Sequence, residues 1–138
     1  MPNLHPLVVH FPVALLLMAV LLELIALLWK QPEFSRAAWW NQIAGTLGLA
    51  FAVASGLFAE STVHMADDAS ELFERHELIA FVAATLFVTL LLWRIGSRGA
   101  PPRQRWIFLL LLAAGAVLLL TGAYYGGEMV FRYGVGVR

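Results

Sequence analysis

The chain lacks cysteine entirely. Without a thiol it forms no disulfide, no thiolate metal site, no iron–sulfur centre and no thioether attachment of haem. Charge is also scarce, because charged residues make up 13% of the 138 residues, whereas a soluble domain averages about 25%. The formal net charge is zero, so the total charge indicates no particular partner. Only the distribution of the charges along the chain is informative.

Hydrophobic residues are abundant instead. They make up 61% of the chain, against about 45–50% in a soluble domain, which is typical of a membrane protein. Crossing a bilayer takes about 20 mostly apolar residues, and four stretches meet this requirement. They are residues 11–29, 37–59, 69–93 and 106–124. We therefore expect a single domain over residues 1–138, an all-α integral membrane four-helix bundle with a short glycine-rich C-terminal tail.

Local signals mark where these helices begin and end. Asp68 followed by Glu71 is a capping-box pattern, which predicts that the third helix starts near Ala69. Gly126 and Gly127 predict the end of the fourth helix. The first stretch has no basic residue ahead of it, unlike a signal peptide, so we expect it to be retained as a span.

The connections between the predicted spans differ in charge. The first holds Lys30 and Arg36 against Glu33, and the third holds four arginines and no acid: Arg94, Arg98, Arg103 and Arg105. The second, residues 60–77, carries six carboxylates against Arg75 alone. By the positive-inside rule the first and third connections face the cytoplasm and both termini are extracytoplasmic. All five tryptophans fall at the cytoplasmic ends of the spans, as in an aromatic belt.

This topology places all four histidines on the outer side. His10 precedes the first span and His76 stands at the mouth of the third, which runs parallel to the first. Counted from the tryptophans at the inner ends, their heights differ by only about 3 Å. Two imidazoles at one depth on parallel helices suit bis-histidine ligation of haem iron, so His10 and His76 are our first candidates for axial ligands. His5 and His64 are candidates for a second haem or for gating access.

A porphyrin also needs space between helices and partners for its propionates. The second span carries a stripe of small residues: Gly45, Gly48, Ala52, Ser55, Gly56 and Ala59. The third adds three alanines below His76: Ala80, Ala83 and Ala84. Arg75 and Arg132 are candidates to pair with the propionates, because a guanidinium matches a carboxylate in a fork geometry.

Other interpretations of the same residues stay open. Interfacial histidines often bond only to water and lipid head groups, and small-residue stripes usually mean close helix packing without a ligand. A third interpretation is a transition-metal site that binds Cu, Fe or Zn, in which the four histidines are completed by Glu60, Asp67 or Glu77. The spacing matches no standard zinc motif.

Glu23 is an acid inside the first span. An intramembrane carboxyl is costly and usually faces the interior of the bundle. A proton relay is one interpretation of this residue. We favour a structural role, in which Glu23 bonds to Gln42 or Arg94 near the inner interface.

The two ends of the chain carry paired motifs, "HPLVVHFPVALL" and "GGEMVFRYGVGV". With these motifs and its four spans, the chain resembles the bacterial membrane-protein family catalogued as domain of unknown function 2231. The opening motif maps to His5, Pro6, His10, Phe11 and Pro12, and the closing motif maps to Gly126, Gly127, Gly134, Val135, Gly136 and Val137. Some members resemble fusions of this domain to Rieske-type or cytochrome c-type modules, so the resemblance implies a redox setting.

These observations lead to one principal hypothesis and two alternatives. We expect a multi-pass protein of the bacterial cytoplasmic membrane that holds haem b near the outer face and transfers electrons. Its partners would be the lipid bilayer and a quinone, or an extracytoplasmic c-type cytochrome or Rieske-type protein, with a homo-oligomer possible and no nucleic acid. The alternatives are a transition-metal binding or transport protein and a non-catalytic assembly subunit. No nucleophile constellation indicates a stand-alone enzyme.

Overall fold

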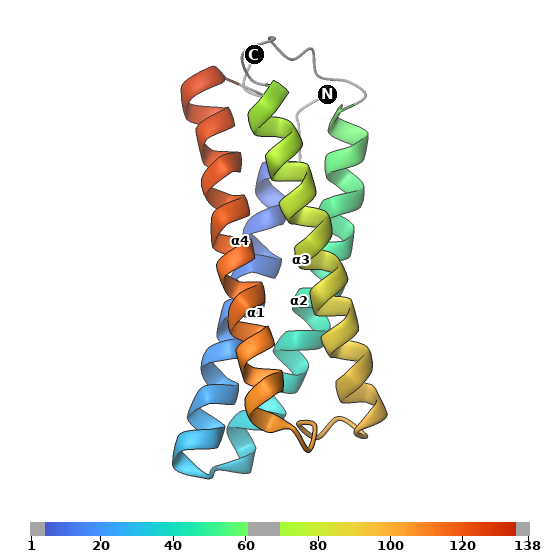
Figure 1. Cartoon of the computed structure of the whole chain (residues 1–138). Helices are drawn as coiled ribbons and strands as arrows, with labels where there is room; N and C mark the ends of the chain where they lie inside the picture. The colour runs from blue at the N-terminus through green and yellow to red at the C-terminus, as the bar shows by residue number, and fades with distance from the viewer. Residues whose placement is uncertain (1–4, 61–69, 135–138) are drawn as a thin grey trace.

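The computed structural model describes residues 5–60 and 70–134, with side chains from 8–58 and 70–134, and contains four α-helices in these residues (Figure 1). The helices are α1 (His5–Trp29), α2 (Pro32–Glu60), α3 (Ser70–Gly96) and α4 (Arg105–Tyr133). No strand occurs in the same residues. The predicted all-α class is confirmed for this part of the chain.

The helices run alternately up and down, so that α1 and α3 are parallel to each other (Figure 1). Helix α1 packs most extensively against α2, and α3 packs most extensively against α4. The contacts of α1 with α4 and of α2 with α3 are less extensive. Helices α1 and α3 therefore lie across a diagonal of the bundle. We call the end with the short connections, residues 30–31 and 97–104, the basic end, and the opposite end, where α1 begins and α4 ends, the histidine end.

The surface of the bundle is apolar. Large hydrophobic side chains point outward along its length, for example Phe11 (66% exposed), Phe51 (64%) and Leu110 (67%). Exposing such groups to water costs about 25 cal/mol per Å² of apolar surface, whereas lipid tails solvate them without that penalty. All four helices are long and apolar enough to cross a membrane, so the outward faces are suited to contact with lipid.

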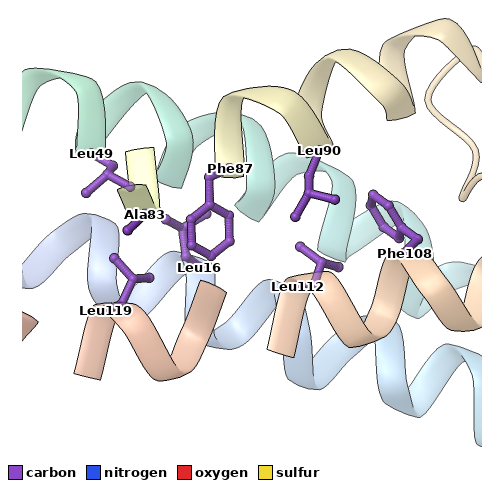
Figure 2. Packing of buried hydrophobic residues seen from close by; sticks show 8 residues of the cluster. All are labelled: Leu16, Leu49, Ala83, Phe87, Leu90, Phe108, Leu112 and Leu119. Atoms are coloured by element: carbon purple, nitrogen blue, oxygen red, sulfur yellow. The ribbon is translucent and has the colours of Figure 1, made fainter. Parts of the chain in front are cut away.

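The core lies in the middle of the bundle and extends toward the basic end. Eight buried side chains form one cluster that joins all four helices (Figure 2): Leu16, Leu49, Ala83, Phe87, Leu90, Phe108, Leu112 and Leu119. On α3 the described buried side chains begin only at Ala83, which is about two helical turns from His76. The histidine end is therefore less tightly filled by side chains of α3.

Glycines allow the helices of each pair to approach closely. A Cβ atom at Gly45 would lie 2.6 Å from Leu16, and one at Gly115 would lie 2.7 Å from the ring of Phe87. At Gly48 a Cβ atom would meet Pro12 of α1 at 3.2 Å. The small-residue stripe of α2 is thus occupied by α1 at these two positions. At that level it serves helix packing and leaves no space for a porphyrin.

The helix ends differ from the sequence prediction in three places. Helix α1 begins at His5, ahead of the predicted span at residues 11–29. Helix α4 does not end at Gly126 and Gly127 but continues to Tyr133, where Gly134 closes it with a left-handed φ of 66°. Lipid-exposed side chains and packing against α3 stabilise the helix across the two glycines, which outweighs their low intrinsic helix propensity. Helix α2 begins at Pro32, because proline in the first turn lacks only an N–H that would have no intrahelical acceptor.

Candidate functional site

His76 is held by a hydrogen bond across the α3–α4 interface. Its Nδ1 atom lies 2.9 Å from the carbonyl oxygen of Gly122, and the side chain is half-buried. A carbonyl oxygen only accepts, so Nδ1 carries the hydrogen and donates it. In the neutral ring the lone pair is then on Nε2. Histidines that bind metals usually donate their other ring N–H in this way, which fixes the tautomer and the ring orientation.

Glycine at position 126 lets the imidazole lie against α4. A Cβ atom there would be 3.3 Å from Cε1 and 3.6 Å from Nδ1 of His76. Gly122 and Gly126 are four residues apart and so share one face of α4, in the small-xxx-small pattern that brings membrane helices together. Sequence reasoning missed the role of this pair, although the spacing "GAYYG" was the signal for it.

His10 lies on α1, an exposed side chain on the helix diagonally opposite α3. The sequence placed it just before the first span, but the helix begins at His5 and His10 is already in its second turn. Because the backbone of residues 5–10 is helical, the two positions face about 140° apart, which disfavours a shared ion. The side chain of His5 and all of His64 lie outside the described part of the chain.

Arg75 and Arg132 line one cleft between α3 and α4 at the histidine end. The cleft has a volume of about 320 Å³ and is lined by Glu71, Leu72, Arg75, Tyr124, Tyr125, Glu128, Arg132 and Tyr133. Each arginine is paired within its own helix, Arg75 with Glu71 at 2.7 Å and Arg132 with Glu128 at 3.7 Å. Arg75, Glu71 and Arg132 are largely exposed, whereas Glu128 is 33% exposed, so solvent weakens the Arg75–Glu71 pair more than the Arg132–Glu128 pair.

The described side chains contain no group of three or more His, Asp or Glu residues that could hold a metal ion. Of the carboxylates expected to complete such a site, Glu77 is half-buried on α3, next to His76. The side chain of Glu60, and all of Asp67, lie outside the described residues.

Two features of the histidine end bear on the haem site that the sequence predicts. The Nε2 lone pair of His76 is available, because the hydrogen bond to Gly122 engages the other ring nitrogen. The buried side chains of α3 begin only at Ala83, although His76 and Ile79 already pack against the glycines of α4. His10, the second ligand that the sequence predicts, lies on the parallel helix α1 with an exposed side chain.

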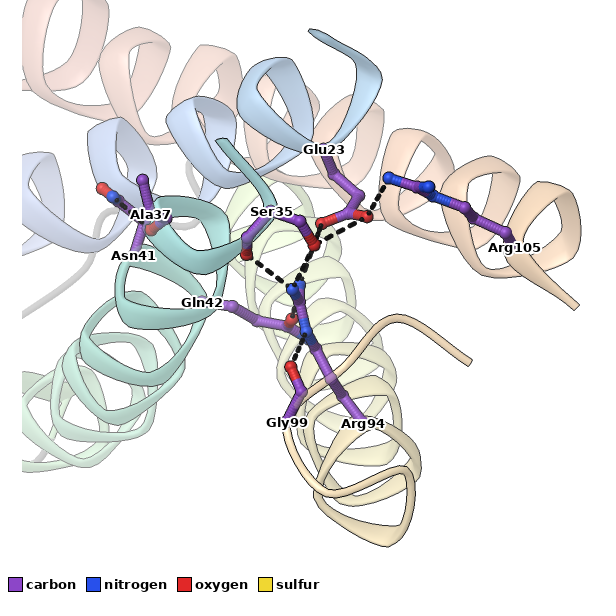
Figure 3. A network of polar contacts seen from close by, with 8 residues as sticks. All are labelled: Glu23, Ser35, Ala37, Asn41, Gln42, Arg94, Gly99 and Arg105. Atoms are coloured by element: carbon purple, nitrogen blue, oxygen red, sulfur yellow. Dashed lines mark hydrogen bonds and ion pairs between the residues drawn. The ribbon is translucent and has the colours of Figure 1, made fainter. Parts of the chain in front are cut away.

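A second polar cluster lies at the basic end, inside the bundle (Figure 3). Arg94 of α3 and Glu23 of α1 form an ion pair of 3.2 Å, and their side chains are 1% and 0% exposed. Gln42 accepts a hydrogen bond from Arg94 at 3.2 Å. Both partners that the sequence proposed for Glu23 are thus present, Arg94 by direct contact and Gln42 through Arg94.

The guanidinium of Arg94 is saturated with acceptors. Its Nε donates to the carbonyl oxygen of Gly99, one terminal nitrogen contacts Glu23 and Gln42, and the other donates to the backbone and hydroxyl oxygens of Ser35. The rings of Trp39 and Phe108 lie 5.5 and 5.8 Å from its central carbon. A fully bonded buried arginine joins the helices at one point, which supports a structural role for the Glu23–Arg94 pair.

Arg105 and Ser35 also bind Glu23, and the sequence did not identify them. Arg105, the first residue of α4, lies 3.3 Å from Glu23 and is 30% exposed. The Ser35 hydroxyl lies 3.0 Å from the carboxylate. Arg105 is 82 residues from Glu23, and only the packing of α4 against α1 brings them together. No local pattern in the sequence could have indicated this contact.

Comparison with known proteins supports the membrane assignment. No curated protein and no solved structure matches the chain. One family model, described as "Predicted membrane protein (DUF2231)", matches residues 1–138. The match covers the whole bundle, including both the histidine end and the basic end. The chain therefore belongs to the DUF2231 family of predicted membrane proteins.

Proposed function

We propose that this protein binds haem b at its histidine end and transfers electrons within the membrane. The observation that carries the proposal is the hydrogen bond from His76 Nδ1 to Gly122, which orients the ring and leaves the Nε2 lone pair available. The bound haem would supply one-electron redox chemistry, for which none of the described side chains substitutes.

The surrounding residues have distinct tasks in this proposal. His76 and His10, on the parallel helices α3 and α1, would hold the haem iron. Arg75 and Arg132 stand at the water-facing cleft, where guanidinium groups stabilise propionates once they exchange their glutamate partners. The hydrogen bond to Gly122 would raise the basicity of Nε2 of His76 toward a bound metal, because it draws the Nδ1 hydrogen partly away.

The basic end faces the cytoplasm in this proposal, by the positive-inside rule. The haem would then lie near the outer face and exchange electrons with a quinone or with an extracytoplasmic redox protein. The acidic connection between α2 and α3 would attract a basic partner by charge complementarity.

A visible spectrum tests the proposal. The full-length protein is expressed with haem supply, purified in detergent, and measured before and after dithionite reduction. We expect a Soret band that shifts on reduction, and we expect His76→Ala and His10→Ala each to remove most of the bound haem. Thr121→Ala, next to Gly122, is the matched control and should keep the haem.

Three outcomes would contradict the proposal. The first is the absence of a Soret band. The second is haem content that survives both histidine substitutions. The third is stoichiometric copper, iron or zinc without haem, bound through the same histidines, which would support the transition-metal alternative instead. The haem-to-protein ratio in His5→Ala and His64→Ala tests whether those histidines hold a second haem.

A further inference from the structure

The basic end carries more positive charge than its own carboxylates neutralise. Its two carboxylates are Glu23 and Glu33. Six basic side chains stand at the same end: Lys30, Arg36, Arg94, Arg98, Arg103 and Arg105. Glu33 pairs with Arg36 at 3.6 Å, and Glu23 is shared between two arginines of the buried cluster. No further carboxylate is available among the described residues at this end.

The uncompensated charge gathers around the start of α4. Arg98 and Arg103 are exposed on the connection that leads into α4, and neither has an ion-pair partner among the described side chains. Arg105 donates to Glu23 through one terminal nitrogen, but its buried Nε has no partner. Glu23 already balances Arg94, so Arg105 adds a positive charge for which the chain provides no second acid.

The surface of α4 that follows these charged residues is apolar. Trp106 and its neighbour Ile107 are 63% and 54% exposed, and Leu110 on the following turn is 67% exposed. An exposed tryptophan also lies at this end of the other hairpin, where Trp29, the last residue of α1, is 66% exposed. Tryptophans of this kind lie at the depth of lipid head groups. A ligand bound here would have its polar part next to the positive charges and its apolar part next to the exposed apolar face of α4.

We propose that the start of α4 binds an anionic phospholipid. Arg103 and Arg105, with Arg98, would bind the phosphate group, and the exposed apolar face of α4 from Trp106 to Leu110 would contact an acyl chain. Gln104, at the cap position of α4, makes no side-chain hydrogen bond to the first turn, so the amide groups there add to the attraction for an anion. The acyl-chain contact favours a lipid over a soluble anion.

Native mass spectrometry of the full-length protein measures this binding directly. The protein is released from nanodiscs of phosphatidylcholine, with or without phosphatidylglycerol, and retained lipids are counted. We expect phosphatidylglycerol to be retained in preference to phosphatidylcholine. Arg103→Gln should weaken its retention about fivefold, which corresponds to one basic side chain at a charged membrane surface. Arg105→Gln should weaken it at least as much.

Arg36→Gln is the matched control, because it removes the same charge from the same end of the bundle. Arg36 is already paired with Glu33, so we expect its loss to change lipid retention little. Arg103 lies outside the buried cluster, which keeps the test valid even if Arg105→Gln disturbs folding through Glu23.

Each of three results would overturn the proposal. Equal retention of the two lipids would show no preference for the anionic head group. An Arg36→Gln effect as large as that of Arg103→Gln would show only diffuse attraction to charge. Displacement of phosphatidylglycerol by millimolar inorganic phosphate would assign the site to a soluble anion.

Discussion

The Nδ1 atom of His76 on α3 donates a hydrogen bond of 2.9 Å to the carbonyl oxygen of Gly122 on α4. The carbonyl of a regular helix is normally engaged by the amide four residues later, so it accepts a second hydrogen bond here. The contact depends on glycine at position 126, where the imidazole lies against α4. The backbone of α4 thereby fixes the orientation of the His76 side chain.

The tautomer of His76 is the first prediction. In ¹⁵N-histidine-labelled protein, at a pH where the imidazole is neutral, Nδ1 of His76 should carry the hydrogen and Nε2 should show the shift of an unprotonated nitrogen. The signal is assigned by its loss in His76→Gln. A hydrogen on Nε2 in the haem-free protein would contradict the hydrogen bond to Gly122, and with it the ligand assignment.

Gly115 should resist substitution because the ring of Phe87 occupies its space. A Cβ atom there would lie 2.7 Å from the ring, so Gly115→Ala should lower the free energy of unfolding by about 1–3 kcal/mol through overpacking. Gly127→Ala is the control on the same helix, with nothing within 4 Å of the added Cβ. It should be neutral or stabilise by up to about 1 kcal/mol, as alanine favours helix. Thermal unfolding in detergent, followed by circular dichroism, measures both variants, and equal effects would refute this packing.

The buried ion pair should matter far more than the exposed one. Arg94→Gln leaves Glu23 buried with only Arg105 and Ser35, so we expect a loss of about 3 kcal/mol, at the low end for a broken buried pair. Arg36→Gln removes an exposed pair and should cost no more than about 1 kcal/mol.

A double-mutant cycle isolates the pair itself. Glu23→Gln combined with Arg94→Gln should cost clearly less than the sum of the two single substitutions, because neither charge is then left uncompensated. If the losses in unfolding free energy were additive, Glu23 and Arg94 would act independently. The ion pair at the centre of Figure 3 would then contribute nothing to stability.

The orientation of the bundle is a separate prediction. Reporter fusions in the connection between α3 and α4, within residues 97–104, should report a cytoplasmic location, and fusions at the C-terminus should report an extracytoplasmic one. The opposite result would place the histidines on the cytoplasmic side and remove the proposed outer redox partners.

The sequence determined the class of the protein. Four continuous apolar runs of about 20 residues are typical of membrane spans, and in lipid such a run pairs its own backbone groups by forming a helix, so four helices followed from composition and length. Glu23 inside the first span predicted an internal partner, because an unpaired carboxyl in lipid is costly, and Arg94 is that partner. Both inferences depend on the free-energy cost of leaving a polar group unpaired in lipid, and this cost does not depend on how the helices are arranged.

Tertiary structure decided which residues meet. The sequence treated Gly126 as a helix end and did not connect Arg105 with Glu23, because both roles depend on which face of α4 turns toward a neighbour. In lipid, apolar periodicity gives little information on that rotation, since inward and outward faces are both hydrophobic. Close approach at glycines and the few buried polar contacts set the rotation, and they exist only once the helices are packed.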